Sequence, residues 1–329
     1  MVLSLLNIQD EEDWYVGNRM EDRDNDSTKA KLRHLTKMFY RREETRSEQG
    51  PLYTYKLMLS SLHNRLEDFV LLSVPPAFNV KSRITRLKKG FVDRRFYPMY
   101  YMHLEREGTG DRKCLVLVAK KYKNLSGTGY IISTDPAELT TGSEYCVGRV
   151  ESNFIGTEFI LYGGRSICTH VPPEQGALMS VPKSERFKEE LASIIYDPNV
   201  LGFKGPRKVK VVLPKMNNLL ERTVVRPRIH EETLICQFKN QEDSIISLKN
   251  KDPIWSKETH SYILNFAGRV TTPSVKNFQI VSEENEEHIM LQFGRASENT
   301  FSLDFRYPFC PLQAFAIALS SFESKLACE

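Results

Sequence analysis

The most continuous apolar pattern in the sequence lies within residues 310–329. Its large apolar side chains recur at helical spacing, at Leu312, Phe315, Leu319 and Phe322. Between the first and third of these only Gln313 is polar, and Pro311 suits the first turn of a helix, where its missing N–H costs nothing. A helix that is apolar on all sides must be buried on all sides. We therefore predict a buried helix over residues 312–326, about 22 Å long.

Short segments rich in β-branched and aromatic residues precede this helix, and Gly, Pro and Asn separate them. They are 68–73, 80–86, 97–104, 114–119, 129–133, 159–162, 208–213, 234–238, 245–249, 262–266, 277–281, 288–293 and 301–305. Strands at this spacing are typical of an antiparallel sandwich or barrel. Residues 184–196 interrupt them with a helical pattern, in which Ser184 is the predicted N-cap. Together with the apolar final helix, the pattern predicts an α+β fold, a closed antiparallel β-barrel around a buried helix.

Residues 1–60 differ from the rest of the sequence. Acidic residues near the start are interrupted by Gly, Ser and Asn, a composition that favours disorder. The basic run 29–42 then carries apolar residues at helical spacing. It fits a membrane-surface helix, a nuclear import signal, a partner-binding helix or a solvated helix in a loose arm. We predict a poorly ordered or partly helical arm over 1–60 and one compact domain over 67–329.

The residues that usually carry catalysis or metal binding show no matching spacing in this sequence. The histidines form no HxxxH or HExxH pattern, and no Ser or Cys lies in a GxSxG-like turn. Six scattered cysteines without a CxxC pair are typical of reduced thiols in an intracellular protein. No apolar segment is long enough for a signal peptide or a membrane span. We therefore expect a soluble, cytoplasmic or nuclear protein that is not an enzyme and holds no metal or cofactor.

Three basic clusters stand out against a net charge of only +4. They contain Lys81, Arg83, Arg86, Lys88, Lys89, Arg94 and Arg95; Lys113, Lys120, Lys121 and Lys123; and Lys204, Arg207, Lys208, Lys210, Lys215, Arg222, Arg226 and Arg228. A solvated charged face is the usual explanation for one such run. Three runs on one domain predict a polarised surface that attracts phosphates, on anionic lipid or on nucleic acid.

Several segments resemble signature motifs of the tubby family. They are Asn-Phe-Ala-Gly-Arg-Val at 265–270, Ser-Val-Lys-Asn-Phe-Gln at 274–279, Gln-Phe-Gly-Arg at 292–295, the C-terminal stretch 310–329, and the shorter matches 82–85, 199–207 and 226–228. The resemblance covers roughly residues 67–329. It implies the fold of that family, a closed barrel of about twelve antiparallel strands around a hydrophobic C-terminal helix.

The resemblance also implies a function. Tubby-like domains bind phosphatidylinositol bisphosphate at the plasma membrane and act as adaptors that help deliver receptors to cilia. A nuclear, transcription-related role has been proposed for some of them. For this chain we therefore expect a monomeric, non-enzymatic, cytoplasmic adaptor with peripheral plasma-membrane or ciliary association. Its expected partners are a phosphoinositide membrane surface and receptor cargo or a ciliary transport complex.

The headgroup site of the family implies a set of positions here. The family uses a Lys and an Arg two residues apart before a Ser-Asn pair, an Asn at the start of an earlier strand and an Arg on an internal helix. The matching residues are Arg149, Glu151, Gly129 and Lys188, and Lys120 lies in a neighbouring basic strand end. A secondary basic patch would contain Lys121, Lys123, Lys204, Arg207, Lys208, Arg226 and Arg228.

The departures from the family pattern predict an altered site. Two positions keep a positive charge, Gly129 lacks the amide, and Glu151 reverses the charge. We expect phosphoinositide binding that is weakened and poorly selective. The alternatives are a nucleic-acid-binding or transcription-linked protein that uses its basic surface, and a protein–protein scaffold without lipid binding. Steep salt dependence would favour nucleic acid, and binding to neither would favour the scaffold.

Overall fold

A computed structural model describes residues 66–87, 98–105, 113–124, 127–164, 188–197, 208–218, 220–258 and 260–323. The arm predicted over 1–60 lies outside these residues. So do residues 184–187 of the predicted internal helix and 324–326 of the predicted C-terminal helix.

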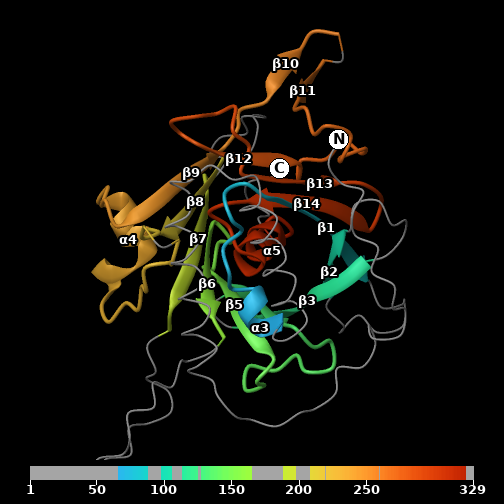
Figure 1. Ribbon diagram of the computed structural model, residues 1–329. Coiled ribbons are helices and arrows are strands. Elements are labelled where there is room, and N and C mark those ends of the chain that lie inside the picture. The colour runs from blue at the N-terminus through green and yellow to red at the C-terminus, as the bar shows by residue number, and fades with distance from the viewer. Residues whose placement is uncertain are drawn as a thin grey trace, which may run out of the picture. The chain divides into compact units, whose positions relative to one another are not determined.

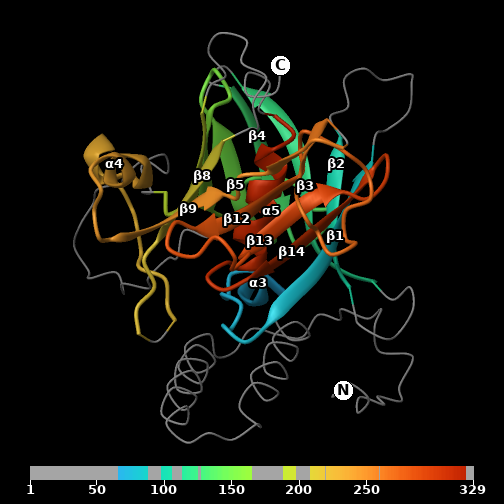
Figure 2. The same ribbon diagram turned by 90° about the horizontal axis from the view of Figure 1, so that it is seen from above.

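Helix α5 (Pro311–Ser320) is buried along its whole length, as its apolar pattern predicts, but it ends at Ser320, and residues 321–323 form a turn where the helix was predicted to continue. Figure 1 shows it at the centre of a ring of strands, and Figure 2 shows it lengthwise, with α3 (Leu66–Phe69) near one end. The polar Gln313 is satisfied inside the core: its Nε2 donates to the carbonyl oxygen of Leu191 at 2.7 Å. Its Oε1 accepts from the backbone N–H of Cys310 at 3.1 Å, which caps the helix.

Twelve antiparallel strands form a closed barrel around α5, in the order β1-β14-β13-β12-β9-β8-β7-β6-β5-β4-β3-β2. Their bounds are β1 (Asn79–Leu87), β2 (Met99–Glu105), β3 (Lys113–Asn124), β4 (Gly127–Ser133), β5 (Cys146–Ser152), β6 (Glu158–Gly163), β7 (Glu190–Tyr196), β8 (Val209–Pro214), β9 (Ile245–Asn250), β12 (Phe278–Ser282), β13 (Leu291–Arg295) and β14 (Thr300–Arg306). The strands β10 (Ile254–Ser256) and β11 (Ser261–Ile263) pair only with each other, as a separate hairpin. The barrel predicted from the sequence is confirmed.

The wall of the barrel closes where β1 meets β14, with Asn79 opposite Arg306. Closure pairs each of the twelve described barrel strands on both sides, so none of them is an edge strand. Inward side chains of the strands and the side chains of α5 form one core cluster. At the C-terminal end of α5, the ring of Phe322 contacts those of Tyr100 and Phe301, with centroids 4.8 and 4.9 Å apart.

The helix predicted over 184–196 is wrong in its described part, because residues 190–196 form strand β7. Leu191, Ala192 and Ile194 are all buried there. The inner face of β7 contacts α5, and α4 (Leu234–Lys239) also contacts this strand. A strand that is buried on both faces loses the alternating pattern and resembles a helical segment.

The short apolar runs 68–73 and 234–238 were predicted as strands, and both predictions are wrong. The first begins within helix α3 and continues as a turn, and the second is helix α4. Thr233 caps α4, since its side chain accepts from the backbone N–H of Cys236 at 3.3 Å. Strands β5, β7 and β10 were missing from the predicted series. Runs of this length do not distinguish strand from helix by periodicity alone.

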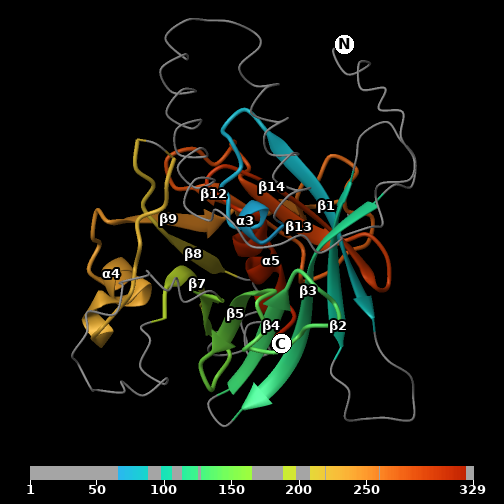
Figure 3. The same cartoon turned by 60° about the horizontal axis from the view of Figure 1, so that its bottom comes forward.

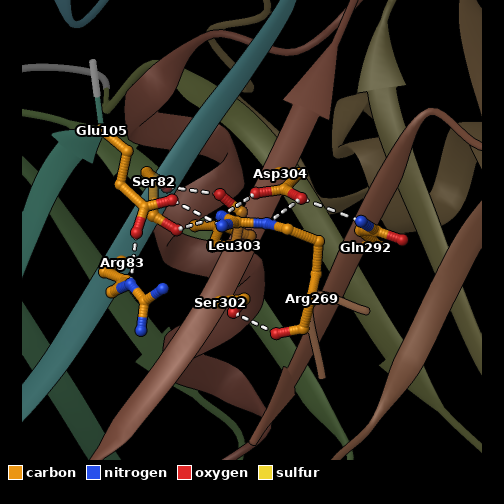
Figure 4. Close-up of polar contacts among 8 residues, drawn as sticks. All are labelled: Ser82, Arg83, Glu105, Arg269, Gln292, Ser302, Leu303 and Asp304. Atoms are coloured by element: carbon orange, nitrogen blue, oxygen red, sulfur yellow. Dashed lines mark hydrogen bonds and ion pairs between the residues drawn. The ribbon is translucent and has the colours of Figure 1, made fainter. Parts of the chain in front are cut away.

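The segment before β12 lies over the outer face of the barrel and is held there by Arg269 (Figure 4). Its guanidinium donates to both carboxylate oxygens of Asp304, at 2.8 and 2.6 Å, and pairs with Glu105 Oε2 at 2.6 Å. Gln292 Nε2 donates to the same Asp304 at 2.8 Å, and Arg83 pairs with Glu105. We call these five residues the Arg269 network. It joins the motif at 265–270 to the motif at 292–295, because Arg269 and Gln292 bond to the same carboxylate.

Candidate functional site

Strands β3 to β6 present two rows of side chains on the outer face of the barrel, and Figure 3 shows β3, β4 and β5 side by side. The first row, read across the paired strands, is Lys120, Ile131, Arg149 and Tyr162. The second row is Tyr122, Gly129, Glu151 and Ile160. Side chains directly opposite one another lie about 4.5–5.5 Å apart at Cβ. We call this surface the β3–β6 face. It brings together four of the five predicted headgroup positions.

Glu151 lies between the two cations that the sequence places at this site. Its Oε1 is 2.8 Å from Arg149 Nε, and its Oε2 is 3.3 Å from Lys188 Nζ. Lys188 lies just before β7 rather than on a described helix, so it reaches Glu151 from the chain next to β6. Two residues apart on one strand, Arg149 and Glu151 point to the same side of the sheet. The carboxylate therefore forms ion pairs with both cations, and another anion would have to compete with it for them.

Position 129 lacks both the amide of the family pattern and the space for a side chain. A Cβ atom at this position would lie only 2.4 Å from Cζ of Tyr122, the residue opposite it on β3. The Tyr122 ring thus fills the space that an Asn side chain would need. Burial raises the pKa of Tyr122 to about 12, and the nearby charge of Glu151 adds to that effect. The phenol is therefore neutral at physiological pH and offers a hydroxyl beside Glu151.

A second tyrosine lies under Lys188, whose Nζ is 4.8 Å from the centre of the Tyr162 ring. This cation–π contact orients the lysine in addition to its ion pair with Glu151. Burial raises the pKa of Tyr162 above its ordinary value, and the charges of Glu190 and Glu151 act in the same direction. The face therefore combines Arg149 and Lys188, one carboxylate and two neutral phenols.

Lys120 and Lys123 are further exposed cations of this region. Neither forms an ion pair with a residue that the structure describes. Lys120 belongs to the first row of the β3–β6 face, two positions from Arg149 across the sheet. Lys123 lies opposite Thr128, near the turn between β3 and β4.

Lys121 does not belong to the surface patch in which the sequence placed it. Its Nζ pairs with Glu323 Oε1 at 2.6 Å, and Glu323 is buried at the C-terminal end of α5. The buried hydroxyl of Tyr130 donates to the same oxygen at 2.8 Å. The cause is strand parity: Lys121 lies between Lys120 and Tyr122 on β3, so its side chain points to the opposite side.

The remaining residues of the predicted secondary patch are divided. Lys208 is exposed just before β8, and Arg228 is exposed in the segment before α4. Arg226 Nη2 pairs with Glu189 Oε2 at 3.0 Å, next in sequence to Lys188. Lys204 and Arg207 lie outside the described residues. These side chains therefore do not all extend the β3–β6 face.

Sequence reasoning missed the two tyrosines. Tyr122 lies two residues after Lys120 on β3 and so points to the same side of the sheet, which was a signal available in the sequence. Tyr162 lies directly opposite Arg149 on the neighbouring strand. Their contacts with Gly129 and Lys188 depend on pairing between strands, which the sequence alone does not fix.

In the described part of the chain, no group of three or more His, Cys, Asp or Glu side chains could hold a metal ion. Within the same residues, no helix has the length and apolarity needed to cross a membrane.

Comparisons with known proteins agree with the fold. A family model described as "Tub family" matches residues 70–324. Tubby-related protein 3 from Mus musculus is 47% identical over 265 residues, which cover 80% of this chain and 55% of that protein. Tubby-related protein 1 from Mus musculus is 45% identical over 264 residues, with coverages of 80% and 46%. Protein king tubby 1 from Aedes aegypti is 43% identical over 265 residues, with coverages of 80% and 60%. The chain thus spans about half the length of the curated relatives it matches.

Proposed function

Because this chain belongs to the tubby family, we propose that it is a non-enzymatic adaptor that binds phosphoinositide membranes peripherally and weakly. We further propose a cytoplasmic protein that associates with the plasma membrane or the cilium and takes part in the trafficking of membrane receptors. The β3–β6 face would receive the headgroup, with Arg149 and Lys188 as its cationic contacts and Lys120 beside them.

One observation carries the proposal of weak binding, namely the position of Glu151. Its carboxylate contacts both Arg149 and Lys188, at 2.8 and 3.3 Å. A bisphosphate headgroup must therefore displace these ion pairs and approach a fixed negative charge. Each cation near an anionic membrane contributes about 1 kcal/mol, so replacing a cation by an anion loses about 2 kcal/mol. That difference corresponds to about thirtyfold in affinity.

The exchange Glu151→Arg tests this proposal. We expect about thirtyfold tighter binding to vesicles that contain phosphatidylinositol bisphosphate, and longer residence at the plasma membrane. Glu151→Gln should give an intermediate gain, because it removes the negative charge without adding a cation. The assay is vesicle flotation across a panel of phosphoinositides, with phosphatidylcholine vesicles as the blank.

Glu286→Gln is the matched control. It removes a carboxylate from an ion pair with Lys249, whose Nζ lies 2.6 Å away, at a site outside the β3–β6 face. The change in net charge equals that of Glu151→Gln, and lipid binding should stay at the wild-type level. Equal gains in both variants would mean that net charge, not the local pair, limits binding. If Glu151→Arg and Arg149→Ala both leave lipid affinity unchanged, the site is on other residues.

A salt titration of binding to duplex DNA, run beside the vesicle assay, tests the nucleic-acid alternative. Duplex DNA binding that falls steeply with salt and exceeds vesicle binding would favour it. The positions of Lys121 and Arg226 weaken that alternative, since both are held in ion pairs with carboxylates.

A further inference from the structure

The turn between β5 and β6 presents two apolar side chains at its tip. Phe154 is 85% exposed, the largest value for any large hydrophobic side chain in the described part of the chain. Ile155 beside it is 57% exposed. Single exposed apolar residues are ordinary on protein surfaces. Phe154 and Ile155 instead form an exposed pair at one tip.

Asn153 fixes the shape of this turn. Its Oδ1 accepts from the backbone N–H groups of Gly156 and Thr157 at 2.8 and 2.9 Å. Its Nδ2 donates to Thr157 Oγ1 at 3.0 Å, and its own N–H donates to the carbonyl oxygen of Glu158 at 2.9 Å. Gly156 adopts φ of 76°, a region that favours glycine. The two apolar side chains are thus held outward, since these hydrogen bonds fix the backbone around them.

The turn lies directly beside the cations of the β3–β6 face. Only two residues separate Phe154 from Glu151 in the sequence. The turn also contacts the β3–β4 hairpin, where the backbone N–H of Thr128 donates to Ser152 Oγ at 3.0 Å. Thr128 is the residue opposite the exposed Lys123. One edge of the molecule therefore combines a rigid apolar tip with adjacent lysines.

We propose that Phe154 and Ile155 insert into the interfacial region of an anionic lipid bilayer while the β3–β6 face contacts the headgroups. This inference rests on the proposed function and extends it from a headgroup site to the orientation of the domain on the membrane. Apolar groups of peripheral proteins enter about 5–10 Å into the headgroup and acyl boundary. Lysines beside them then lie at the level of the anionic headgroups.

The test compares two double variants. Phe154→Ser with Ile155→Ser removes the tip. Val224→Ser with Ile229→Ser is the matched control, because these residues are 58% and 57% exposed on the segment between β8 and α4. On vesicles of phosphatidylcholine, phosphatidylserine and phosphatidylinositol bisphosphate, the tip variant should partition about tenfold less than wild type. The control should partition like wild type, and both should bind soluble inositol trisphosphate as wild type does.

A direct measurement of depth accompanies the partition assay. In Phe154→Trp, lipids brominated on the acyl chains should quench the introduced indole, relative to the wild-type signal of the native tryptophans. The proposal is overturned if this quenching is missing, or if the tip variant partitions like wild type. It is also overturned if wild type binds none of these vesicles, or if the tip variant instead dissolves a concentration-dependent dimer seen by sedimentation.

Failure of the headgroup site would look different. If Arg149→Ala and Lys188→Ala leave inositol trisphosphate and vesicle binding unchanged while the indole is still quenched, the headgroup assignment fails and the tip remains. If those variants lose headgroup binding but the indole is not quenched, the headgroup assignment stands and the proposal for the tip fails.

Discussion

Removing Arg269 should destabilise the domain strongly, because this side chain neutralises a buried carboxylate. Asp304 is only 3% exposed and accepts three hydrogen bonds, two from Arg269 and one from Gln292. Arg269→Met keeps most of the aliphatic stem but leaves Asp304 with the amide alone. It also removes one of the two cationic partners of Glu105, which pairs with the same guanidinium at 2.6 Å and keeps its pair with Arg83.

The magnitude follows from burial. Breaking a buried ion pair by removing one partner costs about 3–5 kcal/mol, because the remaining charge is desolvated without compensation. The free energy of unfolding of a domain is about 5–15 kcal/mol, so this loss is a large share of it. Asp304→Asn combined with Arg269→Met should cost less than the sum of the single changes, since the uncompensated charge is then gone.

Urea unfolding of the wild type and the three variants measures these differences. Lys249→Met is the control, because its partner Glu286 is solvated and its loss should leave the midpoint unchanged. A loss below about 1 kcal/mol for Arg269→Met would refute the reasoning, since it would place the network among ordinary surface pairs. Strict additivity of the two changes would also contradict a direct coupling.

Three further predictions concern stability. Burial raises the pKa of Glu105, but its bonds to Arg83 and Arg269 lower it to a net value below the ordinary one. Its contribution is therefore complete above about pH 4.3 and lost as the pH falls below that, so Glu105→Gln should flatten the acid side of the curve of unfolding free energy against pH. Phe315→Asp places a charge in the core and should abolish soluble protein; a soluble variant with a cooperative melt would contradict this. Limited proteolysis should cut within residues 1–60 before it cuts within 67–329.

The sequence predicts those elements of the fold whose patterns have one cause. Helix α5 is apolar on every side because the barrel surrounds it, so its pattern alone specifies its place. Strand β1 buries one face and only half-buries the other, so its burial alternates along its middle. Strand β7 contacts α5 on one face and is covered on the other, which removes the alternation. Its type is decided by tertiary packing rather than by local sequence.

The candidate site likewise contains contacts that the sequence predicts and contacts that it does not. The spacing of Arg149 and Glu151 places them on one face once β5 is a strand. The same parity on β3 would have placed the side chain of Lys121 on the inner face of the barrel. Its ion pair with Glu323 could not be predicted in this way, because Glu323 lies about 200 positions later in the sequence. The contact between Lys188 and Glu151 joins segments 37 positions apart. No local pattern predicts such a contact.

The pairing of β1 with β14 sets a condition on biosynthesis. Ser82 and Leu303 meet across this seam although they lie 221 positions apart in the sequence. Until residue 306 has left the ribosome, the nascent sheet has two open edges, and its interior helix has not yet been made. Such non-local closure is slow and exposes apolar strands to aggregation. Translation that stops before residue 306 therefore yields an unclosed sheet, a substrate for chaperones and proteases, and not a shorter folded domain.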